Sequence, residues 1–321
     1  MTRFVSILKA FTVSLIAALA FVTSAQAGAP MVKYQAPGYY RTMVGDFEIT
    51  ALSDGTVPLP VEKLLLNTTP EKVEKALDKR FLSSPLQTSV NGYLINTGSK
   101  LVLVDTGAGS LFGPTLGKLI YSLQASGYEA SDVDEIYLTH MHPDHVGGLV
   151  SNGEIVFPNA TVRARKADAD YWLDEANLKA APDSQKGFFQ GAMASINPYI
   201  EAGQFKAFEG DAQLLPGIQA IAAPGHTPGH SIYKVQSKGQ TLMLWGDLIH
   251  VAAVQFPHPS VAIAFDTDSK EAVVQREQAF AEAAKDGELV GAAHLSFPGL
   301  GHLRNAEQGY TFVPINYNAA Q

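Results

Sequence analysis

The sequence predicts an α+β protein built as a four-layer αββα sandwich, in which two mixed β-sheets face each other and helices cover the outside. Three observations predict this fold class. Strand patterns come in runs in both halves of the chain, and helical spacings separate those runs. Of the 321 residues, 46% are hydrophobic and 17% charged, which is enough apolar material for a large core. No linker-like stretch interrupts residues 28–321, so we expect one domain there.

The first elements follow from alternation and turn residues. Residues 46–55 alternate between apolar and polar side chains and end in a Ser-Asp-Gly turn, which predicts a strand. Residues 70–81 have apolar residues at helical spacing. Residues 89–98 and 100–107 are two apolar runs that meet at a Gly-Ser pair, so they predict a hairpin.

The middle of the chain alternates between the two periods. Residues 111–127 have helical spacing closed by a glycine, and 132–140 is a strand pattern that ends in histidine. A short strand at 160–164 precedes two further segments with helical spacing, 166–176 and 187–200.

The last part repeats the strand run and closes with a helix. Short apolar segments separated by glycines predict strands at 218–225, 231–237 and 241–247. Residues 269–287 predict a long helix ended by a glycine, and 288–294 predicts the last strand.

The N-terminal segment predicts a signal peptide. Arg3 and Lys9 precede an apolar run at 10–22, and Ala25-Gln26-Ala27 has the small-x-small pattern of a cleavage site. The run is shorter than the roughly 20 residues that span a bilayer. We therefore expect cleavage after Ala27, export to the periplasm or the medium, and no stable membrane anchoring afterwards.

Composition excludes several classes of function. The net charge is −8 with a pI of about 5.6, and basic residues are not clustered along the sequence, which argues against a binder of nucleic acid or of an anionic membrane. The chain has no cysteine, so disulfides, thiolate ligands and a catalytic thiol are excluded.

Histidines and aspartates gather where predicted strands end. The stretch THMHPDHVGG (139–148) contains His140, His142, Asp144 and His145 within six positions. Three further candidates follow later strands at their ends: His226 in APGHTPGH, Asp247 in WGD and His294 in GAAH. Ligands on strand-end loops can converge on one rim of a sheet sandwich.

Imidazole and carboxylate without thiolate suit Zn, Mn, Co or Fe. A divalent metal lowers the pKa of its bound water to about 7, which supplies hydroxide at neutral pH without a serine or cysteine nucleophile. The set of candidate ligands is large enough for two such ions, which could share a bridging hydroxide and a bridging carboxylate.

The ordered motifs THMHPDH, APGHTPGH, WGD and a late histidine resemble those of the metallo-β-lactamase superfamily. The resemblance implies one metal site made by His140, His142 and His226, and a second made by Asp144, His145 and a late histidine. It implies that Asp247 bridges the two metals and holds the hydroxide nucleophile. VDTG (104–107) is similar to a family turn in which Asp105 supports the metal loop.

Longer segments resemble the methyl parathion hydrolase family and its lactone-hydrolysing, dihydrocoumarin hydrolase-like relatives. They are GYYRTMVGDFEITALSDGT, NTGSKLVLVDTGAGSLFGPTLGKL, GFFQGAMASINPY and HLSFPGLGH. The resemblance implies zinc, a homodimer, and an aromatic pocket mouth at Phe112, Trp172 and Phe188. It implies His294 as the last ligand, and His302 stays the alternative.

The chain departs from the organophosphate hydrolases near the pocket. It has His250 and Phe265 where they have smaller aliphatic residues, and Leu64 lies in a leucine run where they carry an arginine. These departures favour a lactone or aryl-ester hydrolase with promiscuous phosphotriesterase activity. The alternatives are an organophosphate hydrolase and, in another class, a mononuclear iron oxidoreductase of the same fold. A β-lactamase is another alternative within the superfamily. Several β-lactamase classes use a cysteine as a metal ligand, and this chain has no cysteine.

Overall fold

The structure is a computed structural model that describes residues 28–319. The predicted signal peptide, residues 1–27, lies outside the described residues, so cleavage and export stay predictions. A boundary between two compact units falls after Ala36, and all described helices and strands lie beyond it. Among the described residues, no helix is both long and apolar enough to cross a membrane.

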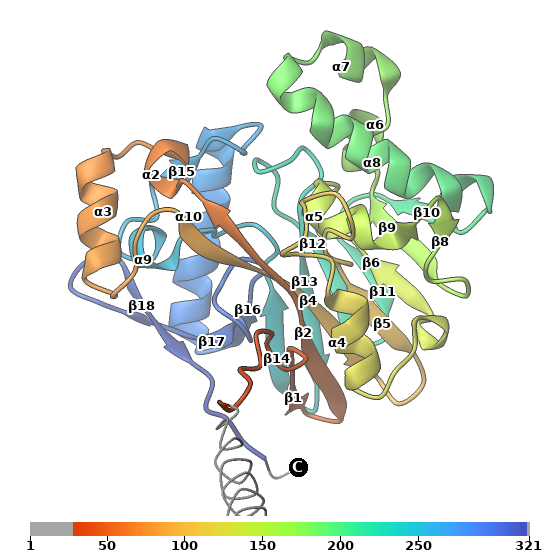
Figure 1. The fold of residues 1–321 in the computed structure, drawn as a ribbon, viewed down its shortest axis with the longest axis horizontal. Coiled ribbons are helices and arrows are strands. Elements are labelled where there is room, and N and C mark those ends of the chain that lie inside the picture. The colour runs from red at the N-terminus through yellow and green to blue at the C-terminus, as the bar shows by residue number, and fades with distance from the viewer. Residues whose placement is uncertain (1–27, 320–321) are drawn as a thin grey trace, which may run out of the picture. The chain divides into compact units, whose positions relative to one another are not determined.

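The first sheet has seven strands in the order β1-β2-β4-β5-β6-β9-β10 (Figure 1). Its first four strands pair antiparallel, and β5, β6, β9 and β10 pair parallel. The strands are β1 Tyr39–Val44, β2 Phe47–Leu59, β4 Leu86–Asn96, β5 Leu101–Val104, β6 Glu135–Tyr137, β9 Thr161–Arg165 and β10 Phe205–Phe208.

The second sheet also has seven strands, in the order β11-β12-β13-β14-β16-β17-β18. They are β11 Ala212–Leu215, β12 Ile218–Ala222, β13 Ser231–Ser237, β14 Gln240–Leu244, β16 Leu289–Gly291, β17 Leu300–Asn305 and β18 Tyr310–Pro314. Two small ribbons complete the strands: β3 Leu65–Leu66 with β15 Ala262–Ile263, and β7 Val150–Ser151 with β8 Glu154–Ile155.

Three apolar layers hold the sandwich together. Side chains of both sheets, such as Tyr93 and Tyr233, are buried against each other in the central layer. A second layer lies between the first sheet and the helices α4, α6 and α8, and a third between the second sheet and α10. Each fully buried aliphatic or aromatic side chain contributes about 1.5–3 kcal/mol. The predicted four-layer αββα sandwich is confirmed.

The helices vary in length because several are single turns in loops. They are α2 Val61–Leu64, α3 Pro70–Asp78, α4 Leu119–Ala125, α5 Pro143–Val146, α6 Lys166–Trp172, α7 Glu175–Ala180, α8 Asp183–Glu201, α9 Ala252–Gln255 and α10 Ser269–Asp286, with 3₁₀ turns at Ala130–Asp132 and Gly147–Leu149. The long helix α10 is capped as its sequence predicts. Asp268 accepts hydrogen bonds from the N–H groups of Lys270 and Glu271, and Gly287 is left-handed with φ of 67°.

Several predicted elements differ from the structure. Residues 166–176 are not one helix, because Asp174 caps the start of α7 directly after α6 ends. Residues 111–118 are turns and not helix, because the buried Asp54 carboxylate accepts hydrogen bonds from the N–H groups of Ala108, Gly117 and Leu119. Residues 132–140 supply a strand of only three residues, since the chain turns early to form the histidine loop. Residues 288–294 are not the last strand, because β17 and β18 extend the second sheet beyond it.

Candidate metal centre

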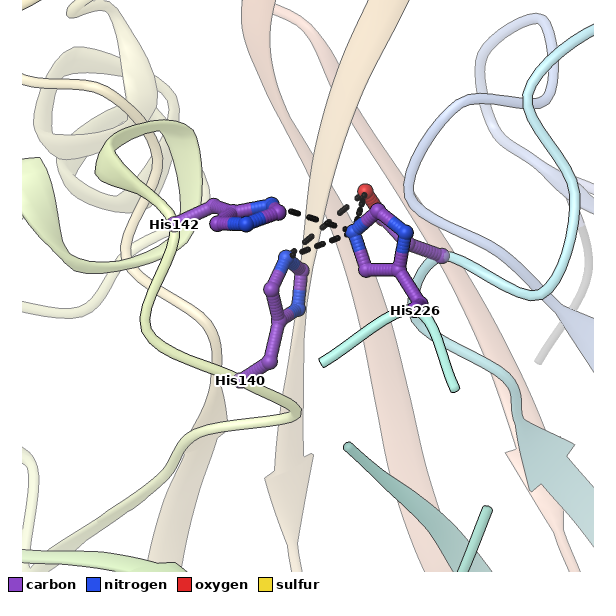
Figure 2. Close-up of side chains that lie close together, drawn as sticks. His140, His142 and His226 are labelled. Carbon is purple, nitrogen blue, oxygen red and sulfur yellow. Dashed lines mark hydrogen bonds and ion pairs between the residues drawn. The ribbon is translucent and has the colours of Figure 1, made fainter. Parts of the chain in front are cut away.

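Three imidazoles converge at the carboxyl ends of the strands. His140 and His142 follow β6, and His226 follows β12. Their rings turn toward one another in Figure 2. The Nε2 atom of His226 lies 3.2 Å from Nε2 of His140 and 3.1 Å from Nδ1 of His142. All three side chains are buried.

A second group lies beside the first. Asp144 and His145, in the single turn α5, meet His294, which follows β16. The Asp144 Oδ2 atom is 3.6 Å from Nε2 of His145 and 3.5 Å from Nε2 of His294. The sequence separates these residues by about 150 positions, and the second sheet brings them together.

Asp247 stands between the two groups. Its Oδ2 atom lies 3.3 Å from Nε2 of His226 and 3.0 Å from Nε2 of His294, while Oδ1 lies 3.2 Å from Nε2 of His145. One carboxylate therefore faces imidazoles of both groups, which is the placement that a bridging ligand needs.

The donor atoms fit divalent cations. Atoms that bind one tetrahedral metal at about 2.1 Å lie roughly 3.4 Å from each other. The spacings among His140, His142, His226 and Asp247 range from 3.1 to 3.8 Å. The Nε2 atom of His145 and the Oδ1 atom of Asp247 are buried and have no hydrogen-bond partner among the described residues. This convergence of imidazole nitrogens and carboxylate oxygens supports two divalent metals. His250 also comes within ligand distance of Asp247 and His294.

The outward nitrogens of four histidines are held by acceptors. His145 Nδ1 lies 2.8 Å from Asp105 Oδ2, and His226 Nδ1 lies 2.9 Å from Asp266 Oδ1. His294 Nδ1 donates to the carbonyl of Ser89 at 2.9 Å, and His140 Nδ1 lies 3.1 Å from Thr139 Oγ1. A hydrogen bond on the outer nitrogen fixes the ring and leaves the inner nitrogen free to bind.

Asp105 organises the histidine loop and does not itself face the cluster. Its carboxylate accepts hydrogen bonds from the N–H of Thr139 at 2.8 Å and from the Thr139 hydroxyl at 2.7 Å. The structure thus places Asp105 where the sequence resemblance implied a supporting residue. Its φ of 59° is rare for a residue with a side chain and persists where surrounding contacts determine it.

Gly147 and Gly148 allow the histidine loop to pack on the turn that carries Asp105. A Cβ atom on Gly148 would lie 2.0 Å from the carbonyl oxygen of Thr106, and one on Gly147 would lie 2.1 Å from that of Ala108. The last two residues of THMHPDHVGG are therefore glycines because two backbone segments touch there.

The histidines of the cluster differ in the direction of their pKa shifts. Burial, with the neighbouring imidazoles, holds the pKa values of His140 and His142 well below the ordinary value. For His145 and His226 burial also lowers the pKa, but nearby carboxylates outweigh it. Asp247, Asp144 and Asp105 raise the pKa of His145 well above its ordinary value, and the pKa of His226 rises to about 9. Protons must leave these rings before a metal binds, so metal affinity increases with pH.

A small cavity opens above the cluster. Its floor is polar and consists of His142, Asp144, Asp247, His250 and His294. Its walls are apolar and consist of Val57, Leu59, Phe112, Leu116, Phe188 and Phe265. The walls carry no charged side chain, which suits a neutral ring with apolar substituents.

Four of the six pocket residues expected from the sequence line this cavity: Phe112, Phe188, His250 and Phe265. Trp172 does not, because it is buried in the core behind His142, with ring centroids 5.0 Å apart. Leu64 does not line the cavity either; like Phe265, it packs against the apolar cluster that contains Val61 and Leu65.

His294 joins the cluster and His302 does not. His302 lies on β17 with an exposed side chain, and its Nδ1 atom is 3.0 Å from the carbonyl oxygen of Gly287.

Three supporting residues were not found by the sequence analysis. Asp266 holds His226, as described above. Asp168, fully buried, accepts hydrogen bonds from the N–H groups of Met141 and Gly229 and so ties the two histidine loops together. His230 accepts a hydrogen bond from the N–H of Asp247 at 3.1 Å. His230 was visible in PGHTPGH, but Asp168 and Asp266 belong to no motif.

The family model of the metallo-beta-lactamase superfamily matches residues 86–294 of this chain. An N-acyl homoserine lactonase of Bacillus sp is 28% identical over 165 residues, which are 46% of this chain and 58% of that protein. The chain thus spans less than two thirds of this curated relative.

Two solved structures agree over almost their whole length. The hydrolase AbOPH of the beta lactamase superfamily is 38% identical, with a TM-score of 0.84, and the match covers 89% of this chain and 100% of AbOPH. AidC, a dizinc quorum-quenching lactonase, is 28% identical, with a TM-score of 0.82. This match covers 88% of this chain and 99% of AidC. The chain belongs to the metallo-β-lactamase superfamily. These names and the geometry of the site support a metal-dependent hydrolase.

Proposed function

We propose that the protein hydrolyses lactones or aryl esters with two divalent metal ions, and that these ions are zinc. The observation that carries the proposal is the position of Asp247 between the three histidines of the first group and the Asp144, His145 and His294 group, at the floor of a cavity with apolar walls. Two metals held there would supply hydroxide at neutral pH and polarise a carbonyl. The relatives named as lactonases support the substrate class.

The walls of the cavity select a neutral, flat substrate. Phe188 and Phe265 face each other with ring centroids 6.4 Å apart, and Phe112 lines the same cavity. A lactone or aryl ring can lie among these side chains with its ester group directed to the floor. An enclosed apolar wall also keeps bulk water away from the ester, which strengthens each polar contact at the floor.

His250 is the residue that we assign to the substrate oxygen. Its ring stacks on His294 with centroids 5.0 Å apart, and its Nε2 atom lies 3.1 Å from Asp247 Oδ2. Burial lowers the pKa of His250 to about 4, so the imidazole is neutral at pH 7 and carries one N–H. That N–H can donate to the carbonyl or leaving oxygen of an ester.

A phosphotriester is the second candidate substrate. Its support is the resemblance of long segments to the methyl parathion hydrolase family, together with the aromatic walls of the cavity. Phe265 and His250 occupy space that a bulky phosphotriester would need, which is why we place lactones and aryl esters first. Homodimer formation and export belong to the same proposal.

A kinetic panel on the metal-loaded enzyme tests the proposal. The panel compares an aromatic lactone, an aryl ester, methyl parathion and a β-lactam, with the metal content of each preparation measured. We expect about two metals per chain and the highest kcat/KM for the lactone or the aryl ester. A preference for methyl parathion would assign the phosphotriesterase, and one iron per chain would favour the oxidoreductase alternative.

A further inference from the structure

Helix α3 separates its charges by face. Lys72, Lys75 and Lys79 occupy successive positions along one side, since residues three and four apart in a helix share a face. The acidic residues of the same helix, Glu71, Glu74 and Asp78, do not line the groove described next. On its inner side α3 is fixed by the buried Val73 and Leu77.

A groove runs along the basic face of α3. Its other side is formed by α9 and the segment that follows, and α3 and α9 lie next to each other in Figure 1. The groove is open to solvent. Five basic or imidazole side chains line it and no acidic side chain does; the five are Lys72, Lys75, Lys79, Arg80 and His258.

The four cations of this groove are unpaired. Lys72, Lys75, Lys79 and Arg80 are exposed, and within residues 28–319 none of them makes an ion pair. Other lysines of the chain do pair, such as Lys100 with Asp134 at 2.6 Å. A concentration of unpaired positive charge on a chain of net charge −8 marks a surface for an anionic partner.

An apolar tip follows the basic face directly. Phe81 is 99% exposed and Leu82 44% exposed. Phe81 has φ of 56°, and hydrogen bonds from its N–H to Asp78 and from Leu82 N–H to Leu77 close the helix. Glycine is the usual residue at such a left-handed helix end, so a phenylalanine held outward there is a costly choice for a surface without a partner.

We propose that the groove and tip, made by Lys72, Lys75, Lys79, Arg80 and Phe81, bind the surface of an anionic phospholipid membrane reversibly. The three lysines extend over about 10 Å of helix, given a rise of 1.5 Å per residue. That is too far apart to converge on one phosphate, but it matches a surface that presents many. Phe81 and Leu82 have no role toward a soluble polyanion, whereas they can enter the boundary between headgroups and acyl chains.

Vesicle flotation of the full chain, loaded with metal, tests this. The vesicles contain phosphatidylcholine with or without phosphatidylglycerol, and the measured quantity is the part of binding that depends on phosphatidylglycerol, so that any contribution of residues 1–27 to both kinds of vesicle cancels. The variant is Lys72→Gln/Lys75→Gln/Lys79→Gln, which keeps good helix formers. We expect the partition coefficient to fall on the order of tenfold to a hundredfold.

A charge-matched control separates the local surface from net charge. Lys179→Gln/Lys206→Gln/Lys270→Gln changes three exposed lysines that make no ion pair within the described residues and do not line the groove. Its binding should change by less than about threefold, because charges more than a Debye length away are screened. Equal losses in the two triple variants would overturn the proposal.

Phe81→Gly tests the apolar tip. Glycine fits the left-handed backbone, so the helix end stays intact while the insertion group is lost. We expect membrane binding to fall several-fold, with kcat/KM for a soluble substrate unchanged in the absence of vesicles. Three outcomes contradict the proposal. The first is binding of the unaltered chain that does not depend on phosphatidylglycerol, and the second is binding to heparin in solution that is as strong as binding to vesicles and unchanged by Phe81→Gly. The third is a dimer in sedimentation that the three-lysine variant dissociates.

Discussion

The floor and the walls of the cavity are built in different ways. In the donor cluster that includes the floor, His145, His226 and His294 each have an outward nitrogen held by an acceptor at 2.8–2.9 Å, and all are buried. On the walls, Phe112 is 38% exposed and Phe265 half-buried, and both are positioned by packing alone. Hydrogen bonds of fixed direction determine ring orientation, whereas packing of rings tolerates substitution.

This difference separates chemistry from selectivity. Substitutions of floor residues should abolish most of the activity, because each donor atom has one place and one orientation. Residues of the walls should act by degrees, because a changed ring volume moves the substrate without disturbing the donors. Four substitutions can break or sharpen this comparison, and their expected effects decrease from the centre of the floor to the walls.

Asp247→Ala should have the largest effect. It removes the one carboxylate that faces both groups of donors and leaves several buried imidazoles without their counter-charge. We expect hydrolysis to fall by a factor of at least about 10³, as for loss of a group that stabilises developing charge, with metal content reduced below two per chain. Activity within tenfold of the unaltered enzyme would contradict the proposed two-metal floor.

His294→Ala should follow, with His302→Ala as its matched control. His294 Nε2 lies 3.5 Å from Asp144 Oδ2 and 3.0 Å from Asp247 Oδ2, while the exposed His302 contacts only backbone carbonyls. We expect a loss of activity on the order of 10²–10³ and loss of one metal for His294→Ala, and a change within threefold for His302→Ala. Metal analysis together with kcat/KM measures both effects, and the reverse ranking would identify His302 on β17 as the ligand.

Asp266→Ala should have an intermediate effect, since Asp266 contacts His226 from behind. Loss of a partner on the outer nitrogen costs roughly 10- to 100-fold in metal affinity. Asp266→Asn is the control, because its amide oxygen can still accept from His226 Nδ1; it should retain more affinity than alanine. Competition with a chelator measures the affinities, and equal losses would mean that the negative charge of Asp266 matters more than the hydrogen bond.

The floor could be predicted from the sequence to a large extent because its donors lie in motifs at strand ends. His140, His226 and His294 needed only the rule that strand ends meet on one rim, which the two sheets obey. The supporting residues escaped because their roles are not local. Asp168 lies in KADADYW, where an acidic residue on a helix is expected to be solvent-exposed. The fold instead buries it, and its carboxylate accepts hydrogen bonds from two N–H groups in loops 88 residues apart.

The fold was predictable at the level of layers and less so at the level of elements. Alternation and glycines identified both sheets, but residues 111–118 carry helical spacing and are turns, since Asp54 binds three N–H groups there and outweighs local propensity. Trp172 shows the same limit: an aromatic residue near the site can line the cavity or support a ligand from behind, and sequence spacing does not distinguish the two.

Phe265→Leu should have the smallest effect on activity and the clearest effect on selectivity. The shorter side chain widens the cavity between Phe188 and His250, to which the Phe265 ring lies at centroid distances of 6.4 and 6.1 Å. We expect the ratio of kcat/KM for methyl parathion to that for an aromatic lactone to rise roughly 3- to 10-fold, the size that one or two methylenes of pocket volume supply. Metal content should not change.

Phe205→Leu is the control for this prediction. Phe205 is a half-buried residue on β10 that does not line the cavity, so its substitution should leave the ratio unaltered. A fall in metal content with Phe265→Leu would mean that the walls help to hold the donors, and the separation of floor from walls would then be wrong.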